Sequence, residues 1–124
     1  MILVADDNED NLQIISRILQ ANGFEVMVER NGKDALERAR QARPELIVMD
    51  VMMPEMSGTE VLERLRESAH TSRIPVILLT AMSQNEDVIA GYQIGADYYM
   101  TKPYTSKELL YGVRLVLGRS TSAS

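Results

Sequence analysis

Five polar side chains of this sequence could together hold a divalent metal ion and a phosphoryl group. Each follows a short apolar run of the kind that forms a buried strand: Asp6, Asp7, Asp50, Thr80 and Lys102. In a parallel α/β sheet the carboxyl ends of the strands share one edge, and ligands bind along it. We therefore expect three carboxylates, one hydroxyl and one ammonium to converge on a single site.

The charges of this set indicate which metal would complete it. The three aspartates carry three negative charges and Lys102 carries one positive charge, so one divalent cation would bring the site to neutrality. Without a cation, clustered carboxylates repel and raise one another's pKa values. The sequence contains no cysteine and one histidine, His70. A bound metal must therefore take oxygen ligands, which points to Mg²⁺, Ca²⁺ or Mn²⁺, and a few carboxylates completed by water are typical of Mg²⁺.

Formation of an acyl phosphate on Asp50 is the chemistry that fits these groups. A carboxylate that attacks phosphorus in line gives an aspartyl phosphate, and the reaction needs mainly positioning and charge neutralisation. Mg²⁺ can bridge Asp50 and one phosphoryl oxygen, while Lys102 and the hydroxyl of Thr80 contact the other two. No general base is needed, because an ionised carboxylate has no proton to remove.

Each of these signals has a plain structural explanation when it is taken alone. The run Asp6-Asp7-Asn8 is often a turn followed by a helix cap, Asp50 could simply begin a loop, and Lys102-Pro103 is usually a turn. Their joint occurrence at the ends of strands that would be neighbours, with a matched charge balance, favours a site.

Strand-like and helix-like runs alternate five times along the chain. Short apolar runs predict strands over residues 2–5, 24–29, 46–49, 76–79 and 98–100. Apolar residues at helical spacing predict helices over residues 10–22, 33–42, 59–67, 85–94 and 106–117, with Ser106 as the N-cap of the last. Five such units predict a flavodoxin-like α/β fold, in which helices cover both faces of a doubly wound, five-stranded parallel sheet. If the strand order is 2-1-3-4-5, the terminal side chains of strands 1, 3, 4 and 5 stand in a row.

Length and composition bound the class of protein. A chain of 124 residues fits one domain, and its net charge of −5 argues against nucleic-acid binding, which needs a basic face. No apolar run approaches the roughly 20 residues of a membrane span, and Asp6-Asp7 interrupts the first apolar stretch, so no signal peptide is visible. These features predict a cytoplasmic domain that makes no direct contact with nucleic acid or membrane.

Four stretches of the sequence closely resemble the motifs of bacterial response-regulator receiver domains of the chemotaxis-regulator type, which act in two-component signalling. They are Asp6-Asp7-Asn8, residues 48–58, Leu79-Thr80-Ala81 and residues 95–103. The part from Asp50 to Gly58 is highly specific by itself, and the strand order 2-1-3-4-5 is the one that this family implies. The resemblance covers about residues 2–118, so we expect a receiver domain over residues 1–118 and a polar tail, or the start of a linker, over residues 119–124.

The resemblance also implies the role of each acidic residue. Asp50 would accept a phosphoryl group from a histidine kinase or a histidine phosphotransfer protein. Asp7 and Asp50 would bind Mg²⁺ directly, together with the backbone carbonyl of Met52, and Asp6 would act largely through water. Such a domain is not a conventional enzyme, but it catalyses its own phosphorylation and dephosphorylation.

The same resemblance implies a switch that responds to the phosphoryl group. Lys102 and Thr80 would contact that group, the Lys102–Pro103 bond would be cis, and Tyr99 would move between outward and inward positions as Thr80 shifts. The face formed by the fourth helix, the fifth strand and the fifth helix would then act on a downstream output domain or protein. The positions that tune the phosphoryl lifetime in such domains are Met52 and Met82 here; both are apolar, which predicts slow self-dephosphorylation.

The residues of the predicted output face are consistent with more than one mode of partner binding. All five tyrosines lie between Tyr92 and Tyr111, which is consistent either with partly buried rings or with an aromatic docking face. Some receivers form a phosphorylation-dependent dimer here through a charged set, and Asp87 and Asp97 fit that set. Gly112 stands where an arginine is expected, which argues against this mode of dimerisation.

Three alternative functions are weighed against the receiver interpretation. A phosphohydrolase of the haloacid dehalogenase type needs a second aspartate two residues after the nucleophile, where this chain has Met52. A dinucleotide-binding domain needs a glycine-rich turn after the first strand, where this chain has five polar residues rich in acid. A receiver-like module that binds partners without phosphorylation usually lacks one of the acidic or lysine positions, all of which are present here.

Overall fold

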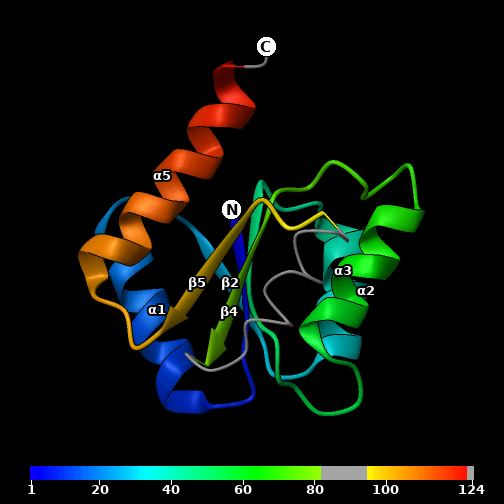
Figure 1. The fold of residues 1–124 in the computed structure, drawn as a ribbon, viewed down its shortest axis with the longest axis horizontal. Helices are drawn as coiled ribbons and strands as arrows, with labels where there is room; N and C mark the ends of the chain where they lie inside the picture. Colours follow the sequence, from blue (N-terminus) through cyan, green and yellow to red (C-terminus); the bar gives the residue numbers. More distant parts are fainter. Residues whose placement is uncertain (82–94, 123–124) are drawn as a thin grey trace.

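The computed structural model describes residues 1–81 and 95–122 of the chain (Figure 1). The predicted fourth helix, together with Met82, Asp87 and Tyr92, lies outside the described residues. None of the helices in the described part combines the length and the apolar character that a bilayer span requires.

Five parallel strands form one sheet in the order β2-β1-β3-β4-β5. Their bounds are Ile2–Ala5 for β1, Val26–Glu29 for β2, Leu46–Asp50 for β3, Val76–Ala81 for β4 and Tyr98–Lys102 for β5. The predicted fold class and strand order are therefore confirmed. Because β2 lies beyond β1 while β3 lies on the other side of β1, the strand order reverses there, and ligands of such sheets bind at the carboxyl edge beside this reversal.

Four described helices cover the two faces of this sheet. They are α1 (Glu9–Ala21), α2 (Gly32–Ala42), α3 (Gly58–Glu67) and α5 (Ser106–Ser122). Figure 1 shows α1 and α5 on one face and α2 and α3 on the other, with the strand arrows ending at the lower edge. The two faces explain why the central strands are apolar throughout, since successive strand side chains point to opposite sides.

Alternate residues of the strands enter two separate cores. In β1, Leu3 packs in the cluster that α2 and α3 cover, whereas Ile2 and Val4 pack in the cluster that α1 and α5 cover. The strand β3 divides in the same way, with Ile47 on the first side and Val48 on the second. This division holds the sheet between its helices and fixes the direction in which each strand end points.

Several element boundaries differ from the sequence-based prediction. The strands β3, β4 and β5 run on to include Asp50, Thr80 and Lys102, which therefore sit in the sheet ladder rather than in the loops after it. At the edge, β2 begins at Val26 instead of residue 24. The helix α5 continues to Ser122, beyond the predicted end at residue 117 and past the amino edge of the sheet (Figure 1).

The predicted N-cap of α5 was wrong by one residue. The hydroxyl of Thr105 accepts a hydrogen bond from the amide of Glu108 at 3.1 Å, and the amide of Thr105 donates to the Glu108 carboxylate at 3.1 Å. This reciprocal pair is a full capping box with Thr105 as the N-cap, so Ser106 is the first residue inside the helix. This capping box closes the short connection that follows Lys102, the last residue of β5.

Candidate functional site

Three carboxylates meet at the carboxyl edge of the sheet, as the sequence predicts. One oxygen of each of Asp6, Asp7 and Asp50 lies within 4.8 Å of the others. Asp6 follows β1 and is fully buried, Asp50 ends β3 and is 7% exposed, and Asp7 is exposed to solvent. The register places them together, because β1 and β3 are neighbours and Ala5 is paired with Met49. A buried acidic cluster with one open side is a suitable donor set for a hard divalent cation.

The carboxylate of Asp6 is held from three sides. Its Oδ1 accepts the backbone amide of Asn8 at 2.9 Å, and its Oδ2 accepts the side-chain amide of Asn11 at 3.3 Å. The ammonium of Lys102 lies 3.4 Å from the same Oδ2. Asn8 is also the N-cap of α1, since its side chain accepts the amide of Asn11. The turn after β1 thus fixes Asp6 and begins α1 at once.

Sequence reasoning missed the role of Asn11. It lies in the first turn of α1 and reaches back to Asp6. A polar residue three positions after a helix cap is common, so no local pattern singles out Asn11. Only the packing of α1 against the sheet edge shows that its amide serves the carboxylate.

Asp50 is the residue on which the contacts of the site converge. Its Oδ1 accepts the amide of Met52 at 3.0 Å, and its Oδ2 lies 2.5 Å from the ammonium of Lys102. The side chain of Lys102 is 29% exposed and also faces Asp6. Two carboxylates thus share one cation, and the third carboxylate, that of Asp7, adds a further negative charge. The four side chains carry a net charge of −2, so the predicted deficit of positive charge is present in the fold.

Lys102 keeps its charge in this environment. Partial burial lowers its pKa, because desolvation disfavours the ammonium form, but the hydrogen bond and negative charge of Asp50 act in the opposite direction, and Asp6 adds to them. The net result is a pKa raised above the usual value for lysine. Lys102 is therefore an ammonium at neutral pH. The Lys102–Pro103 peptide bond is cis, as predicted.

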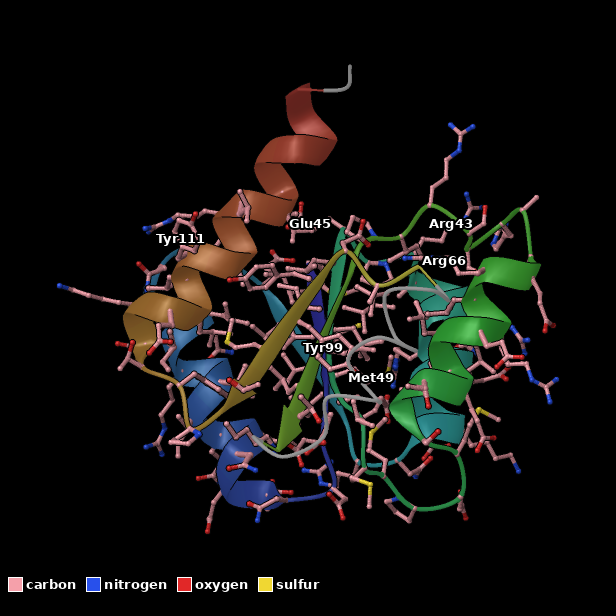
Figure 2. The ribbon with its side chains drawn as sticks, in the orientation of Figure 1. Arg43, Glu45, Met49, Arg66, Tyr99 and Tyr111 are labelled. Atoms are coloured by element: carbon pink, nitrogen blue, oxygen red, sulfur yellow. The ribbon has the colours of Figure 1, made fainter. Side chains whose placement is uncertain are left out.

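Thr80 and Tyr99 lie on adjacent strands beside these groups. Thr80 is 1% exposed and is paired with Thr101 in the ladder of β4 and β5, one residue before Lys102. Tyr99 is buried in the cluster that α2 and α3 cover, where α3 contributes Val61, among others. Figure 2 shows its ring on that side of the sheet. The side chain predicted to act as the switch is thus in an inward, buried position.

One residue of the predicted charged set, Asp97, makes contacts within its own chain. The carboxylate of Asp97 accepts a hydrogen bond from the amide of Val76 at 2.8 Å and from the guanidinium of Arg66 at 3.1 Å. Asp97 is therefore engaged within its own chain. A Cβ placed on Gly112 would lie 3.0 Å from the ring of Tyr98 and 3.0 Å from the side chain of Met100. The position where an arginine was expected is thus already occupied by neighbouring side chains.

Among the described residues, large exposed apolar side chains lie at two places outside the acidic cluster. Tyr111 of α5 is 62% exposed (Figure 2). Ile14 of α1 is 54% exposed and borders a hollow of about 400 Å³, which Asn11, Lys102, Pro103 and Tyr104 also line. Burial raises the pKa of Tyr104, so its phenol is protonated at neutral pH. This hollow adjoins the ammonium that binds Asp50.

Comparison with known proteins gives consistent results. Residues 2–114 match the family model of the response regulator receiver domain. The chain is 37% identical over 123 residues to the alkaline phosphatase synthesis transcriptional regulatory protein PhoP of Bacillus subtilis, covering 99% of this chain and 50% of that protein. It therefore spans about half the length of the curated relatives it matches.

Solved structures extend this similarity to the fold. The receiver domain of the Francisella response regulator 1452 has a TM-score of 0.88 at 35% identity, covering 96% of this chain and 97% of that one. The receiver domain of the sensor histidine kinase PA1611 from Pseudomonas aeruginosa has a TM-score of 0.87 at 29% identity, covering 94% and 96%. That structure is described as holding a magnesium ion coordinated in its active-site cleft.

Proposed function

The chain belongs to the response regulator receiver domain family of two-component signalling, and from this premise we propose that it accepts a phosphoryl group on Asp50 with Mg²⁺ bound beside it. The observation that carries this proposal is a cluster of three carboxylates, two of which share the one ammonium of Lys102, with a net charge of −2 at the open edge of the sheet. Negative charge that is not balanced in a partly buried site destabilises the folded protein, and a bound cation removes this penalty.

The contacts within the cluster support a division of roles among the acidic residues. Both oxygens of Asp6 already accept hydrogen bonds, so Asp6 would reach the metal largely through water. Asp7 is exposed and Asp50 faces it, so these two would bind Mg²⁺ directly, together with the backbone carbonyl of Met52. The ion would supply neutralising charge and a fixed contact for one phosphoryl oxygen.

Phosphoryl transfer would proceed by in-line attack of an Asp50 oxygen. Oδ1 is occupied by the amide of Met52, so Oδ2 is the oxygen that would bond to phosphorus. The P–N bond of the phosphohistidine donor breaks as the O–P bond forms, and its electron pair stays with the departing imidazole. Lys102, which binds Oδ2 before transfer, would move onto a phosphoryl oxygen, and the hydroxyl of Thr80 would donate to another.

The donor would be a histidine kinase or a histidine phosphotransfer protein. The apolar hollow beside Lys102, with Ile14 exposed at its border, offers a surface on which an apolar helix could lie while its histidine reaches Asp50. The output would be a downstream domain or protein. The relatives described as transcriptional regulators are about twice as long as this chain, whereas the acidic charge of this domain argues that it does not itself bind nucleic acid.

The switch would couple the phosphoryl group to the output face through Thr80 and Tyr99. Movement of the Thr80 hydroxyl toward the phosphoryl group changes the space available to the Tyr99 ring on the neighbouring strand. In the structure that ring is buried in the core cluster on the α2–α3 face of the sheet. Partners specific for the phosphorylated form would bind the surface of β5 and α5 in its changed arrangement, where Tyr111 is exposed.

Mass spectrometry of the intact protein tests this function. The domain is incubated with acetyl phosphate, with and without Mg²⁺, beside an Asp50→Asn variant. One phosphoryl adduct is expected, which requires Mg²⁺ and is absent from the variant. A folded protein that binds Mg²⁺ but gains no adduct would point to dependence on a protein donor. If it neither binds Mg²⁺ nor gains an adduct, it would instead be a receiver-like module that acts without phosphorylation.

A further inference from the structure

The loop between β3 and α3 (residues 51–57) is attached closely to the reactive carboxylate. At its start, the amide of Val51 donates to the carbonyl of Leu79 at 2.9 Å, and at its end the amide of Gly58 donates to the carbonyl of Val51 at 2.8 Å. Between these points, the amide of Met52 donates to Oδ1 of Asp50. The loop therefore carries the donor that orients Asp50.

The tip of this loop has a constrained shape. Glu55 has a φ of 68°, in the left-handed region that residues other than glycine rarely adopt. The amide of the next residue, Met56, donates to the carbonyl of Pro54 at 2.7 Å, which closes a tight turn. The side chain of Met56 packs against the core on the α2–α3 face of the sheet, so the tip is anchored as well as the ends.

The first residue of α2 lies directly against this tip. A Cβ placed on Gly32 would lie 1.9 Å from the carbonyl oxygen of Met56 and 2.7 Å from its carbonyl carbon. Neither distance is compatible with van der Waals packing. The φ of Gly32 is outside the left-handed region, so a larger residue would be excluded by the loop rather than by its own backbone conformation. Asn31, the N-cap of α2, fixes this first turn through its bond to the amide of Asp34.

We propose that Gly32 is a positioning residue for the metal site, because only its missing side chain lets the loop after Asp50 take this place. The inference rests on the proposed function, since the loop carries Met52, whose carbonyl is the proposed third Mg²⁺ ligand. Gly32 itself touches neither the carboxylates nor the metal. It acts through the Met56 carbonyl, and displacement of this tip shifts the Met52 segment away from Asp50 and Asp7.

The chain offers two glycines as matched controls. A Cβ on Gly112 would also meet neighbours, the side chains of Tyr98 and Met100 at 3.0 Å, but it lies on α5, on the other face of the sheet. A Cβ on Gly118 would meet nothing within 4 Å. Gly112→Ala thus imposes steric strain away from the loop, and Gly118→Ala imposes none.

The test measures Mg²⁺ affinity by calorimetry and the free energy of unfolding for all three alanine variants. Gly32→Ala is expected to weaken Mg²⁺ binding by about tenfold or more, as loss of an outer support of a metal site does, while the folded protein remains. Gly112→Ala and Gly118→Ala are both expected to leave the Mg²⁺ affinity unchanged, and Gly118→Ala to raise the free energy of unfolding, because alanine is favoured over glycine inside an exposed helix. Wild-type affinity in folded Gly32→Ala would overturn the proposal, as would an equal loss of affinity in Gly112→Ala.

If Gly32→Ala does not fold, Asn31→Ala takes its place, because it loosens the first turn of α2 without adding bulk. Weaker Mg²⁺ binding in Asn31→Ala than in Gly112→Ala would support the proposal, and equal affinity in the two would overturn it. Mg²⁺ binding by the wild-type protein is measured in the same series. Its absence would contradict the proposed function, whereas its presence with no effect at Gly32 would contradict only this inference.

Discussion

Two clusters of charged side chains lie at opposite ends of the sheet, and they differ in how their charges are balanced. At the amino end, the guanidinium of Arg66 donates to the carbonyls of Ile74 and Gly95 at 2.8 Å each and to the carboxylate of Asp97. At the carboxyl end, the acidic residues outnumber the one ammonium by two. Figure 2 shows Arg66 near the upper ends of the strands, far from the edge where the arrows end. The first cluster is balanced by the chain itself, and the second is not.

The balanced cluster serves the fold. Burial lowers the pKa of Arg66, and the charge of Asp97 works against that effect. Within the described residues, the guanidinium joins α3 to the segments that precede β4 and β5. A Cβ on Gly95 would lie 3.1 Å from the Arg66 side chain, which shows how closely the two segments approach. The unbalanced cluster also joins several segments, the ends of β1, β3 and β5 and the first turn of α1, but it leaves two negative charges uncompensated. Buried charge that the chain itself does not balance therefore distinguishes the site from the structural cluster.

The largest expected effect is the loss of stability when the Arg66 cluster is broken. Arg66→Met should lower the free energy of unfolding by about 2–3 kcal/mol, less than for a fully buried pair because Asp97 is partly exposed. Mg²⁺ affinity should not change. Urea denaturation and calorimetry check this, with Arg64→Met, an exposed arginine of the same helix, as the control. If Arg66→Met loses no more stability than Arg64→Met, the Arg66 cluster does not serve the fold as stated.

A smaller effect of opposite sign is expected at the carboxyl edge. Asp7→Asn removes one of three neighbouring negative charges while leaving the Lys102–Asp50 contact intact. Without metal, the variant should be more stable than the wild type by about 1 kcal/mol, the repulsion of two charges about 4–5 Å apart in a solvent-like dielectric. Thermal denaturation in EDTA measures this difference. Added Mg²⁺ should then stabilise the wild type more than the variant, and a variant less stable than the wild type in EDTA would contradict the account.

The smallest effect is expected where both partners of an ion pair are exposed. Arg30 donates two hydrogen bonds to Glu9, at 2.6 and 2.9 Å, and this hydrogen bonding lowers the pKa of Glu9. The contribution of this ion pair to the free energy of unfolding is therefore present above the ordinary glutamate pKa, and it is lost as the pH falls through the lowered pKa of Glu9. Because solvent screens the pair, Arg30→Gln should leave the denaturation midpoint at neutral pH unchanged within error. A clearly lower midpoint for Arg30→Gln would contradict the expectation that solvent exposure makes this ion pair weak.

The convergence of the site could be predicted from the sequence because it follows from chain topology. Once apolar runs are assigned as parallel strands, the residues that end them must meet at one edge. Asp6, Asp50 and Lys102 therefore needed no contact information to be placed together. The charge deficit could be counted from residue types alone, and the structure places the same groups in contact.

Other features depend on packing that no local pattern reveals. The ion pair of Asp97 with Arg66, which stands 31 positions earlier in the chain, could not be inferred from the pattern of charged residues. The close approach of Gly32 to Met56 joins two segments with no shared motif. The N-cap of α5 was misplaced because Thr105 and Ser106 are both good capping residues, and only the bonds to Glu108 decide between them.

We propose that one divalent cation completes the acidic cluster, and a calorimetric titration with Mg²⁺ measures this binding. One bound ion per chain is expected, with binding strongly weakened in both Asp7→Asn and Asp50→Asn and unchanged in Arg66→Met. An Mg²⁺ titration of the folded wild-type protein that shows no binding at millimolar concentrations would contradict it. So would binding that survives both aspartate substitutions, because the ion would then sit elsewhere.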